Sequence, residues 1–136
     1  MKLKMKDVFK LSKGLSDLSS GFKLPATIAF KVSRNEKKIA AEISLYNEHY
    51  TRIIQENAIL GSDGLPEVFE ENGQKIYKFK DGCAETAVSE ISSLESAEID
   101  IDLSTLSISE FKNSDGKDLD IYPHIFSDLD MIINEV

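Results

Sequence analysis

The sequence predicts an α+β fold: a long helical hairpin that carries a β-hairpin at its tip, and a small sheet that joins the N-terminal strand to the 98–108 region. Three observations predict it. Apolar residues recur every three or four positions over most of residues 8–60, which is typical of amphipathic helices. Asn72-Gly73 lies between two alternating segments, a strong local sign of a β-hairpin. Residues 2–6, like the start of the 98–108 region, alternate between apolar and charged side chains, as half-buried strands do.

The first two elements are a strand over residues 2–6 and a helix that we expect Asp7 to cap. Apolar residues at three- and four-residue spacing form the buried stripe of this helix, and Gly21 is predicted to end it. Gly14 lies inside the helix, where glycine costs up to about 1 kcal/mol relative to alanine. We expect it to be tolerated there rather than required by a neighbouring element. The stripe consists of Val8, Leu11, Leu15, Leu18 and Phe22.

The longest predicted element is a helix from Pro25 to about Leu60, because proline suits a first helical turn and no glycine or proline follows until Gly61. Its apolar residues keep a nearly heptad spacing. Two asparagines, Asn35 and Asn57, fall in or beside this seam, and we expect both to lie at its margin. The seam consists of Ile28, Val32, Ile39, Ile43, Tyr46, Tyr50, Ile53 and Leu60.

A β-hairpin and a second helix follow. The strands are predicted at Val68–Glu70 and Lys75–Phe79, since the Asn72-Gly73 pair between them accepts the positive φ angles of a type I′ turn. A helix of about 14 residues then begins after Gly82. We expect it to return antiparallel along the second half of the long helix. Its small-residue face, Ala84, Ala87, Ile91 and Leu94, is predicted to meet Ile39, Ile43, Tyr46, Tyr50 and Ile53.

The last third of the chain is predicted to add a strand and a helix. Residues 98–103 carry acidic side chains on one face and apolar ones on the other, and Leu106 and Ile108 are expected to continue this strand. We expect it to pair with residues 2–6, because the charged faces of the two strands have opposite signs. Pro123 opens a final helix, whose inner side consists of Ile125, Phe126, Leu129, Ile132 and Ile133.

Length and composition are those of one small globular domain, so we predict a single domain over residues 1–136. The single cysteine, Cys83, cannot form an internal disulfide, as is typical of a reducing cytosol. No stretch approaches the roughly 20 apolar residues of a membrane span, and the N-terminus lacks the apolar run of a signal peptide. We therefore expect no membrane partner and a location in the cytoplasm of the cell that makes the protein.

Charge is divided unevenly along the chain. Residues 1–38 hold ten Lys/Arg and three acidic side chains, a net charge of +7, whereas residues 39–136 have a net charge of −15. The whole chain is acidic, with a pI near 4.8, so we expect no direct nucleic-acid partner. The acidic stretch 81–136 also suits a mimic of DNA, although solubility and pairing with the basic N-terminus are the simpler explanation.

No catalytic or metal-binding motif is recognisable. His49 and His124 are the two histidines, and we expect both to be structural rather than partners of Cys83. Residues 115–126 resemble a calcium loop, but the glycine stands at the second position rather than the sixth, and Phe126 replaces the final glutamate. We therefore predict no enzymatic activity, no cofactor and no metal.

Two groups of residues are candidate sites for a protein partner. Phe69, Tyr77 and Phe79 lie on hairpin strands that are too short to bury both faces, and an isolated two-stranded hairpin is marginal in water. These aromatic residues are therefore expected either to dock on the chain's own helices or to meet another protein or a second copy of the chain. The second group is acidic: Asp100, Asp102, Asp118 and Asp120.

Several sequence features occur in a recognisable order. Lys2-Leu-Lys-Met-Lys6 precedes a short helix, Leu24-Pro25 opens the long one, and the β-hairpin precedes Glu98-Ile-Asp-Ile-Asp102 and Leu129-Asp-Met-Ile-Ile133. This order resembles a family of small uncharacterised proteins encoded by tailed phages and prophages of Gram-positive bacteria. The resemblance implies a phage origin and no particular chemistry, and it supplies no catalytic residues.

Together these expectations favour a non-enzymatic, phage-encoded protein-binding module that acts in the host cytoplasm, as an inhibitor of host or antiviral-defence machinery. The expected partner is a host or phage protein, with self-association as a further option. The alternative is a virion-morphogenesis component that joins head to tail or assembles the tail. A third hypothesis is an acidic DNA-mimic inhibitor.

Overall fold

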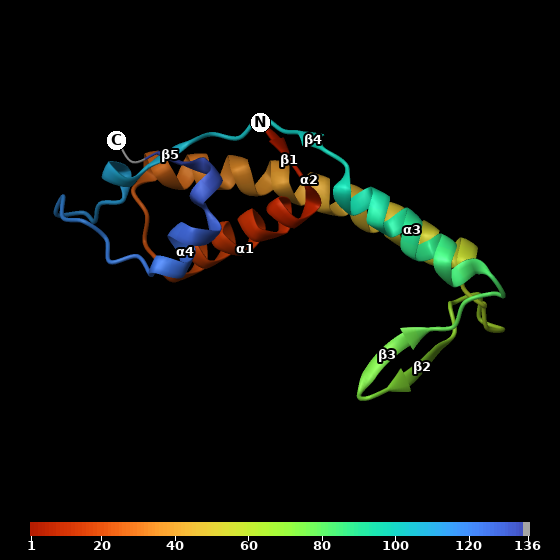
Figure 1. The fold of residues 1–136 in the computed structure, drawn as a ribbon. Helices are drawn as coiled ribbons and strands as arrows, with labels where there is room; N and C mark the ends of the chain where they lie inside the picture. The colour runs from red at the N-terminus through yellow and green to blue at the C-terminus, as the bar shows by residue number, and fades with distance from the viewer. Residues whose placement is uncertain (135–136) are drawn as a thin grey trace. The chain divides into compact units, whose positions relative to one another are not determined.

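A computed structural model gives the fold and describes residues 1–134 (Figure 1). The fold is α+β, with helices joined to three two-stranded sheets. The helices are α1 (Met5–Gly21), α2 (Ala26–Asn57), α3 (Cys83–Ser96) and α4 (Pro123–Asp128), with 3-10 turns η1 (Ile108–Glu110) and η2 (Asp130–Ile132). The strands are β1 (Lys2–Leu3), β2 (Val68–Glu71), β3 (Gln74–Tyr77), β4 (Ile99–Asp100), β5 (Leu106–Ser107) and β6 (Ile133–Asn134).

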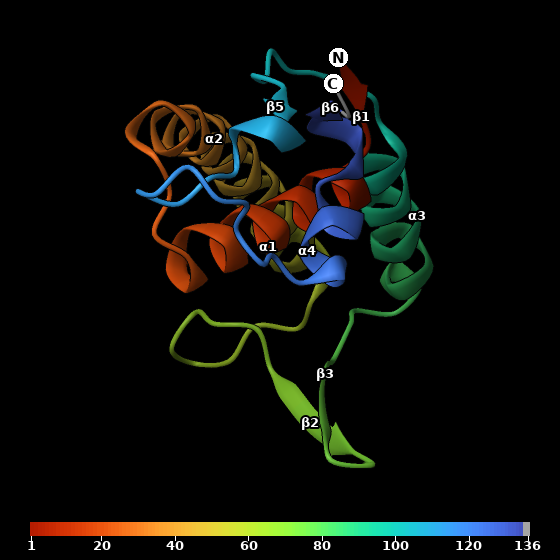
Figure 2. The same cartoon turned by 90° about the vertical axis from the view of Figure 1, so that its left-hand side faces the viewer.

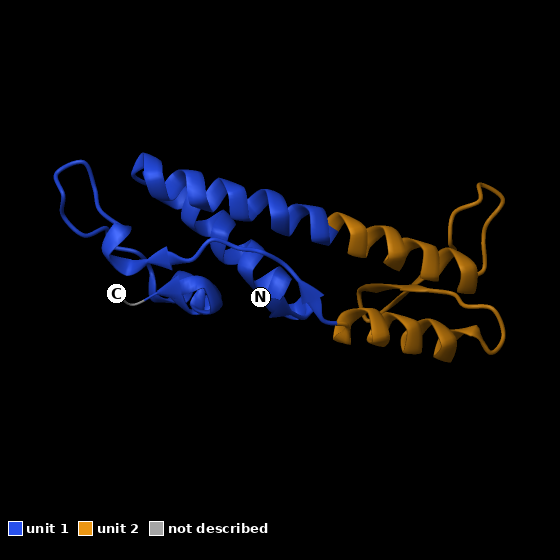
Figure 3. Ribbon diagram, turned by 90° about the horizontal axis from the view of Figure 1, so that it is seen from above, with its two compact units in different colours: residues 1–43, 98–136 blue, residues 44–97 orange. Residues whose placement is uncertain are grey.

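The chain divides into two compact units, coloured separately in Figure 3. Unit 1 contains residues 1–43 and the chain from residue 98 onward, and unit 2 contains residues 44–97. Helix α2 therefore begins in unit 1 and ends in unit 2. The single domain expected from the sequence stays a prediction.

The core of unit 1 includes α1 and α4, which lie side by side (Figure 2), together with buried residues of α2. The predicted α1 stripe is confirmed from Val8 to Leu18, whose four residues are fully buried, whereas Phe22 lies beyond the end of the helix and is half-buried. We expected Gly14 to be simply tolerated in the helix, and this prediction is wrong. A Cβ atom added there would lie 2.7 Å from Leu129 Cδ2 and 2.9 Å from Asp128 Cβ, so glycine is what lets α4 approach α1 this closely.

The N-terminal strand is shorter than predicted, because α1 begins at Met5. Asp7 is therefore not the cap but the third residue of the helix, and its Oδ2 accepts a hydrogen bond from the Lys4 backbone N–H at 3.1 Å. Met5 is three residues before Val8, so the same inward position suits a helix as well as a strand, and both side chains are buried.

The predicted pairing of the N-terminal strand with the acidic strand is confirmed. β1 and β4 are antiparallel, with Lys2 opposite Asp100 and Leu3 opposite Ile99. The Ile101 N–H extends the ladder by donating to the Met1 carbonyl at 2.9 Å. This pairing brings a basic strand against an acidic one and buries Leu3.

Two predictions about the C-terminal region are wrong. Leu106 does not continue β4, because β5 forms a separate parallel pair with β6, and Ile108 lies in η1. The last helix ends at Asp128 rather than running through Ile133. The residues beyond it turn through η2, which buries Ile132 and brings β6 beside β5.

Both asparagines of α2 are buried rather than at the margin of the seam. Asn35 is 1% exposed and binds the Ser104 backbone twice, donating to its carbonyl at 2.9 Å and accepting from its N–H at 2.8 Å. Asn57 is 6% exposed and donates to the Ile53 carbonyl at 2.8 Å. Because one amide side chain satisfies both backbone groups of Ser104, Asn35 fixes an irregular segment of unit 1 to α2.

Unit 2 contains α3 beside the second half of α2, as predicted (Figure 3). The Tyr46 hydroxyl donates to Glu95 Oε1 at 3.0 Å, so the end of α3 lies near the start of this half of α2. Burial, with the hydrogen bond and charge of Glu95, raises the pKa of Tyr46 to about 12. Of the residues expected in this contact, Ala87 and Ile53 are buried, whereas Ile39 and Ile43 belong to unit 1.

Candidate binding surface

The β-hairpin of unit 2 is fixed at its base by the chain that leaves α2. Ile59 bonds to both chains at this base, donating its N–H to the Lys78 carbonyl and accepting from the Glu67 N–H, both at 2.8 Å. The Lys80 N–H also donates to the Asn57 carbonyl at 2.9 Å. Ala58 forms an isolated bridge with Phe79. The hairpin is therefore held by backbone hydrogen bonds rather than by a flexible linker.

The hairpin turn is the one that the sequence predicts. Asn72 and Gly73 have φ angles of 53° and 79°, as a type I′ turn requires. The register places Val68 opposite Tyr77 and Glu70 opposite Lys75. β3 ends at Tyr77, so Phe79 lies beyond the strand in its bridge to Ala58.

No residue of β2 or β3 is buried. The hairpin projects away from α3 in both side views (Figures 1 and 2). Val68 is 47% exposed and Phe69 is 39% exposed, whereas Tyr77 and Phe79 are half-buried. The expected docking of the hairpin on the chain's own helices would have buried at least one of its faces, and no strand residue shows such burial.

The loop before the hairpin adds apolar residues that the sequence interpretation missed. We call the exposed apolar residues of this loop and of the hairpin the hairpin surface. They are Ile59, Leu60, Leu65, Val68 and Phe69. The sequence does contain a sign of Ile59 and Leu60, because α2 ends at the polar Asn57 and apolar residues continue directly up to Gly61. The sequence pattern alone assigns them to the end of the helix.

The two hairpin strands differ in charge. Glu67, Glu70 and Glu71 lie on or beside β2, and Lys75, Lys78 and Lys80 lie on or beside β3. Within residues 1–134, none of these six side chains takes part in a salt bridge. The hairpin therefore carries an acidic strand and a basic strand whose charges face solvent.

The acidic candidate residues lie in unit 1 and do not converge on one site. Asp100 is 3.4 Å from the N-terminal amino group, Asp102 lies 3.8 Å from Lys38 Nζ, and Asp118 forms an ion pair with Lys112. Asp120 is exposed at the end of the same loop. Each of the first three carboxylates faces a cation of the chain itself, which weakens the resemblance to a DNA-like row of charges.

The two histidines also have structural partners. His49 Nδ1 lies 2.7 Å from an Arg52 guanidinium nitrogen. His124 stacks on Tyr122 with ring centroids 5.8 Å apart, and its Nε2 is 3.8 Å from Asp17. In the described part of the chain, no group of three or more His, Cys, Asp or Glu residues is placed to hold a metal ion. Nor does residue range 1–134 contain a helix of the length and apolar character needed to cross a membrane.

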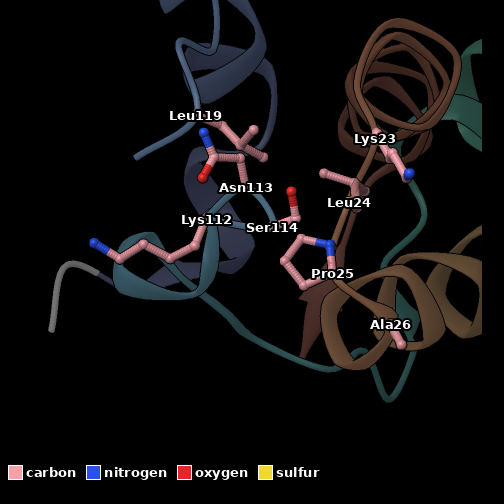
Figure 4. A pocket seen from close by; sticks show the side chains of 8 residues that line it. All are labelled: Lys23, Leu24, Pro25, Ala26, Lys112, Asn113, Ser114 and Leu119. Atoms are coloured by element: carbon pink, nitrogen blue, oxygen red, sulfur yellow. The ribbon is translucent and has the colours of Figure 1, made fainter. Parts of the chain in front are cut away.

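A surface pocket of about 380 Å³ lies in unit 1, where the start of α2 meets the 112–119 loop (Figure 4). Leu24, Pro25 and Leu119 form its apolar part. Lys23 and Lys112 also line it, but their amino groups point away from the enclosed space (Figure 4). Neither lysine therefore places its charge inside the pocket, and Asn113 and Ser114 supply its uncharged polar lining.

Comparisons with known proteins return no family. No protein-family model, no curated protein and no solved structure matches this chain. The candidate binding surface is therefore identified only from the exposed apolar side chains and the charges of the hairpin, and not from a related protein.

Proposed function

We propose that this chain is a phage-encoded, non-enzymatic module that binds a protein partner in the host cytoplasm through the hairpin surface of unit 2. The observation that carries this proposal is a hairpin without a buried residue whose neighbouring loop also exposes apolar side chains. A two-stranded hairpin is marginal in water unless it packs against something. Apolar and aromatic residues ringed by charges are typical of protein interfaces.

The phage origin and a host or antiviral-defence target are the parts of the proposal that rest on the family resemblance. The binding role rests on the hairpin surface. A DNA-mimic role receives less support, since Asp100, Asp102 and Asp118 are next to cations of the chain. An interface built on Phe69 and its apolar neighbours instead favours a protein ligand.

A pull-down from host lysate with tagged wild-type and Phe69→Ala chains tests this function. The wild type should enrich one or a few host proteins, and Phe69→Ala should lose at least about tenfold of that enrichment, as expected for an aromatic interface residue. Phe30→Ala is the matched control, because Phe30 is 64% exposed in unit 1, beside Arg34. It should capture the same proteins as the wild type.

Circular dichroism of both variants must match that of the wild type, which shows that α1, α2 and α3 remain folded. Equal capture by Phe69→Ala and the wild type would contradict the proposed surface. Sedimentation of the chain with purified phage particles would favour the virion-morphogenesis role instead.

A further inference from the structure

We propose that one face of the hairpin binds the same face of a second copy of this chain, forming a two-fold symmetric dimer. This inference deepens the proposed function, because it names the occupant of one part of the hairpin surface. It rests on the order of residues along β2 and β3 and on the charges of these strands, which form no salt bridge within residues 1–134.

Strand alternation divides the hairpin side chains between two faces. Val68, Glu70, Lys75 and Tyr77 share one face, which we call the Glu70 face. Phe69 and Ile76 share the opposite face with Glu71 and Gln74. Both faces are solvent-accessible, because no residue of either strand is buried.

The charge pattern selects how two hairpins can meet. Edge-to-edge pairing of β2 with a second β2 would set Glu70 and Glu71 against the glutamates of the other copy. Pairing β3 with a second β3 would bring Lys75 near another lysine in the same way. Like charges placed opposite one another destabilise strand contacts, so a symmetric edge-to-edge dimer is disfavoured.

Stacking two hairpins face to face has the opposite result. A two-fold axis that runs parallel to the strands places β2 of one copy over β3 of the other. Because Glu70 and Lys75 are directly opposite within one hairpin, this operation sets Glu70 over Lys75 of the second copy, twice. It also sets Val68 over Tyr77. The Glu70 face is therefore complementary to itself in both charge and apolar character.

The opposite face is less self-complementary. The same operation would set Phe69 over Ile76, but it would place the charged Glu71 over the neutral Gln74. We therefore assign self-association to the Glu70 face. Phe69, on the other side of the hairpin, is left free for the heterologous partner of the proposed function.

Sedimentation equilibrium of four samples tests the dimer: wild type, Glu70→Lys, Lys75→Glu, and an equimolar mixture of the two variants. The wild type should show a dimer with twice the 15.2 kDa chain mass. Each variant alone should dimerise about tenfold or more weakly, because two attractive contacts become repulsive. The mixture should restore dimers, since one chain then carries two basic side chains on this face and the other two acidic ones, so both contacts again join opposite charges.

The mixed sample distinguishes a lost contact between two chains from a destabilised hairpin within one chain. Each variant hairpin carries two like charges across its own strands, and mixing cannot repair that defect. Lys112→Glu, which disrupts the ion pair with Asp118 in unit 1, is the charge-matched control and should dimerise like the wild type.

A wild type that remains monomeric at high concentration would overturn the dimer, as would a mixture that stays as weak as its components. Neither result affects the proposed function, which is measured by host-protein capture and depends on Phe69. Conversely, loss of capture in Phe69→Ala with an intact dimer would support both assignments.

Discussion

The two compact units of this chain differ in how far they bury their apolar side chains. Of the buried apolar residues in the described chain, sixteen lie in unit 1 and four in unit 2. Unit 2 nevertheless contributes seven of the twelve large apolar side chains that are exposed. Unit 1 therefore has a core of its own, whereas unit 2 leaves much of its apolar surface without cover from residues 44–97.

Charged side chains show the same contrast. In unit 1, Lys31 meets Glu110 at 3.0 Å, and Lys38 and Lys112 meet Asp102 and Asp118. In the hairpin of unit 2, the charges of the two strands remain outside any salt bridge within the described chain. The difference separates a unit whose surface charges pair in part within the chain from a hairpin whose charges face solvent.

The largest expected change in stability comes from a substitution in the core of unit 1. Leu15→Ala should lower the free energy of unfolding by about 2–5 kcal/mol, because Leu15 is fully buried and its removal leaves a cavity. Val88→Ala is the matched control in unit 2, where Val88 is 65% exposed, and should change stability by less than about 0.5 kcal/mol. Urea denaturation followed by circular dichroism measures both. Similar losses in the two variants would remove the contrast between the units.

A second variant sharpens the description of the α1–α4 contact. Gly14→Ala should destabilise the chain by about 1–3 kcal/mol, since the new methyl group would overlap Leu129 and the Cβ of Asp128. Gly21→Ala is its control, because nothing lies within 4 Å of a Cβ added there. It should be neutral or stabilising by up to about 1 kcal/mol. A gain of stability in Gly14→Ala would show that α4 does not pack closely on α1.

The smallest effect concerns unit 2 and depends on pH. Tyr46→Phe should cost about 0.5–1.5 kcal/mol near neutral pH, because it removes the hydrogen bond to Glu95. Because the pKa of Tyr46 is raised to about 12 in the folded state, the contribution of protonated Tyr46 to stability is complete at pH values below the ordinary tyrosine pKa of 10.0. This contribution is lost as the pH rises towards the folded-state pKa. The stability difference between wild type and Tyr46→Phe should therefore shrink as pH rises from 10.0 towards about 12.

Tyr122→Phe provides the matched control, since Tyr122 is 60% exposed. Denaturation of all three chains over this pH range would show the effect. A difference that is independent of pH would mean that burial and the contact with Glu95 do not raise the pKa of Tyr46 in the folded state.

Local signals in the sequence predict much of this fold. The stripe of α1, the Asn72-Gly73 turn and the pairing of opposite charges between β1 and β4 all depend on residues close in sequence or on simple charge matching. The errors concern positions that depend on distant parts of the chain. Gly14 could not be interpreted without Leu129, and the burial of Asn35 follows from its two bonds to Ser104.

The candidate surface was predicted only in part. The aromatic hairpin was recognised because two short alternating strands cannot bury both faces. Ile59, Leu60 and Leu65 were missed, since an apolar residue after a helix is as consistent with burial as with exposure. The acidic candidates were chosen from their alternation, which does not reveal that Lys38 and Lys112 lie beside them.

Amide hydrogen exchange, followed by mass spectrometry over a range of protein concentrations, tests the contrast between the units most directly. Peptides from α1 should be strongly protected at every concentration, because their hydrogen bonds surround a buried stripe. Peptides from β2 and β3 should exchange rapidly in dilute samples and become protected as the chain associates or binds a partner. Hairpin protection that equals that of α1 at the lowest concentration would contradict the account, because the hairpin would then need no second molecule to cover it.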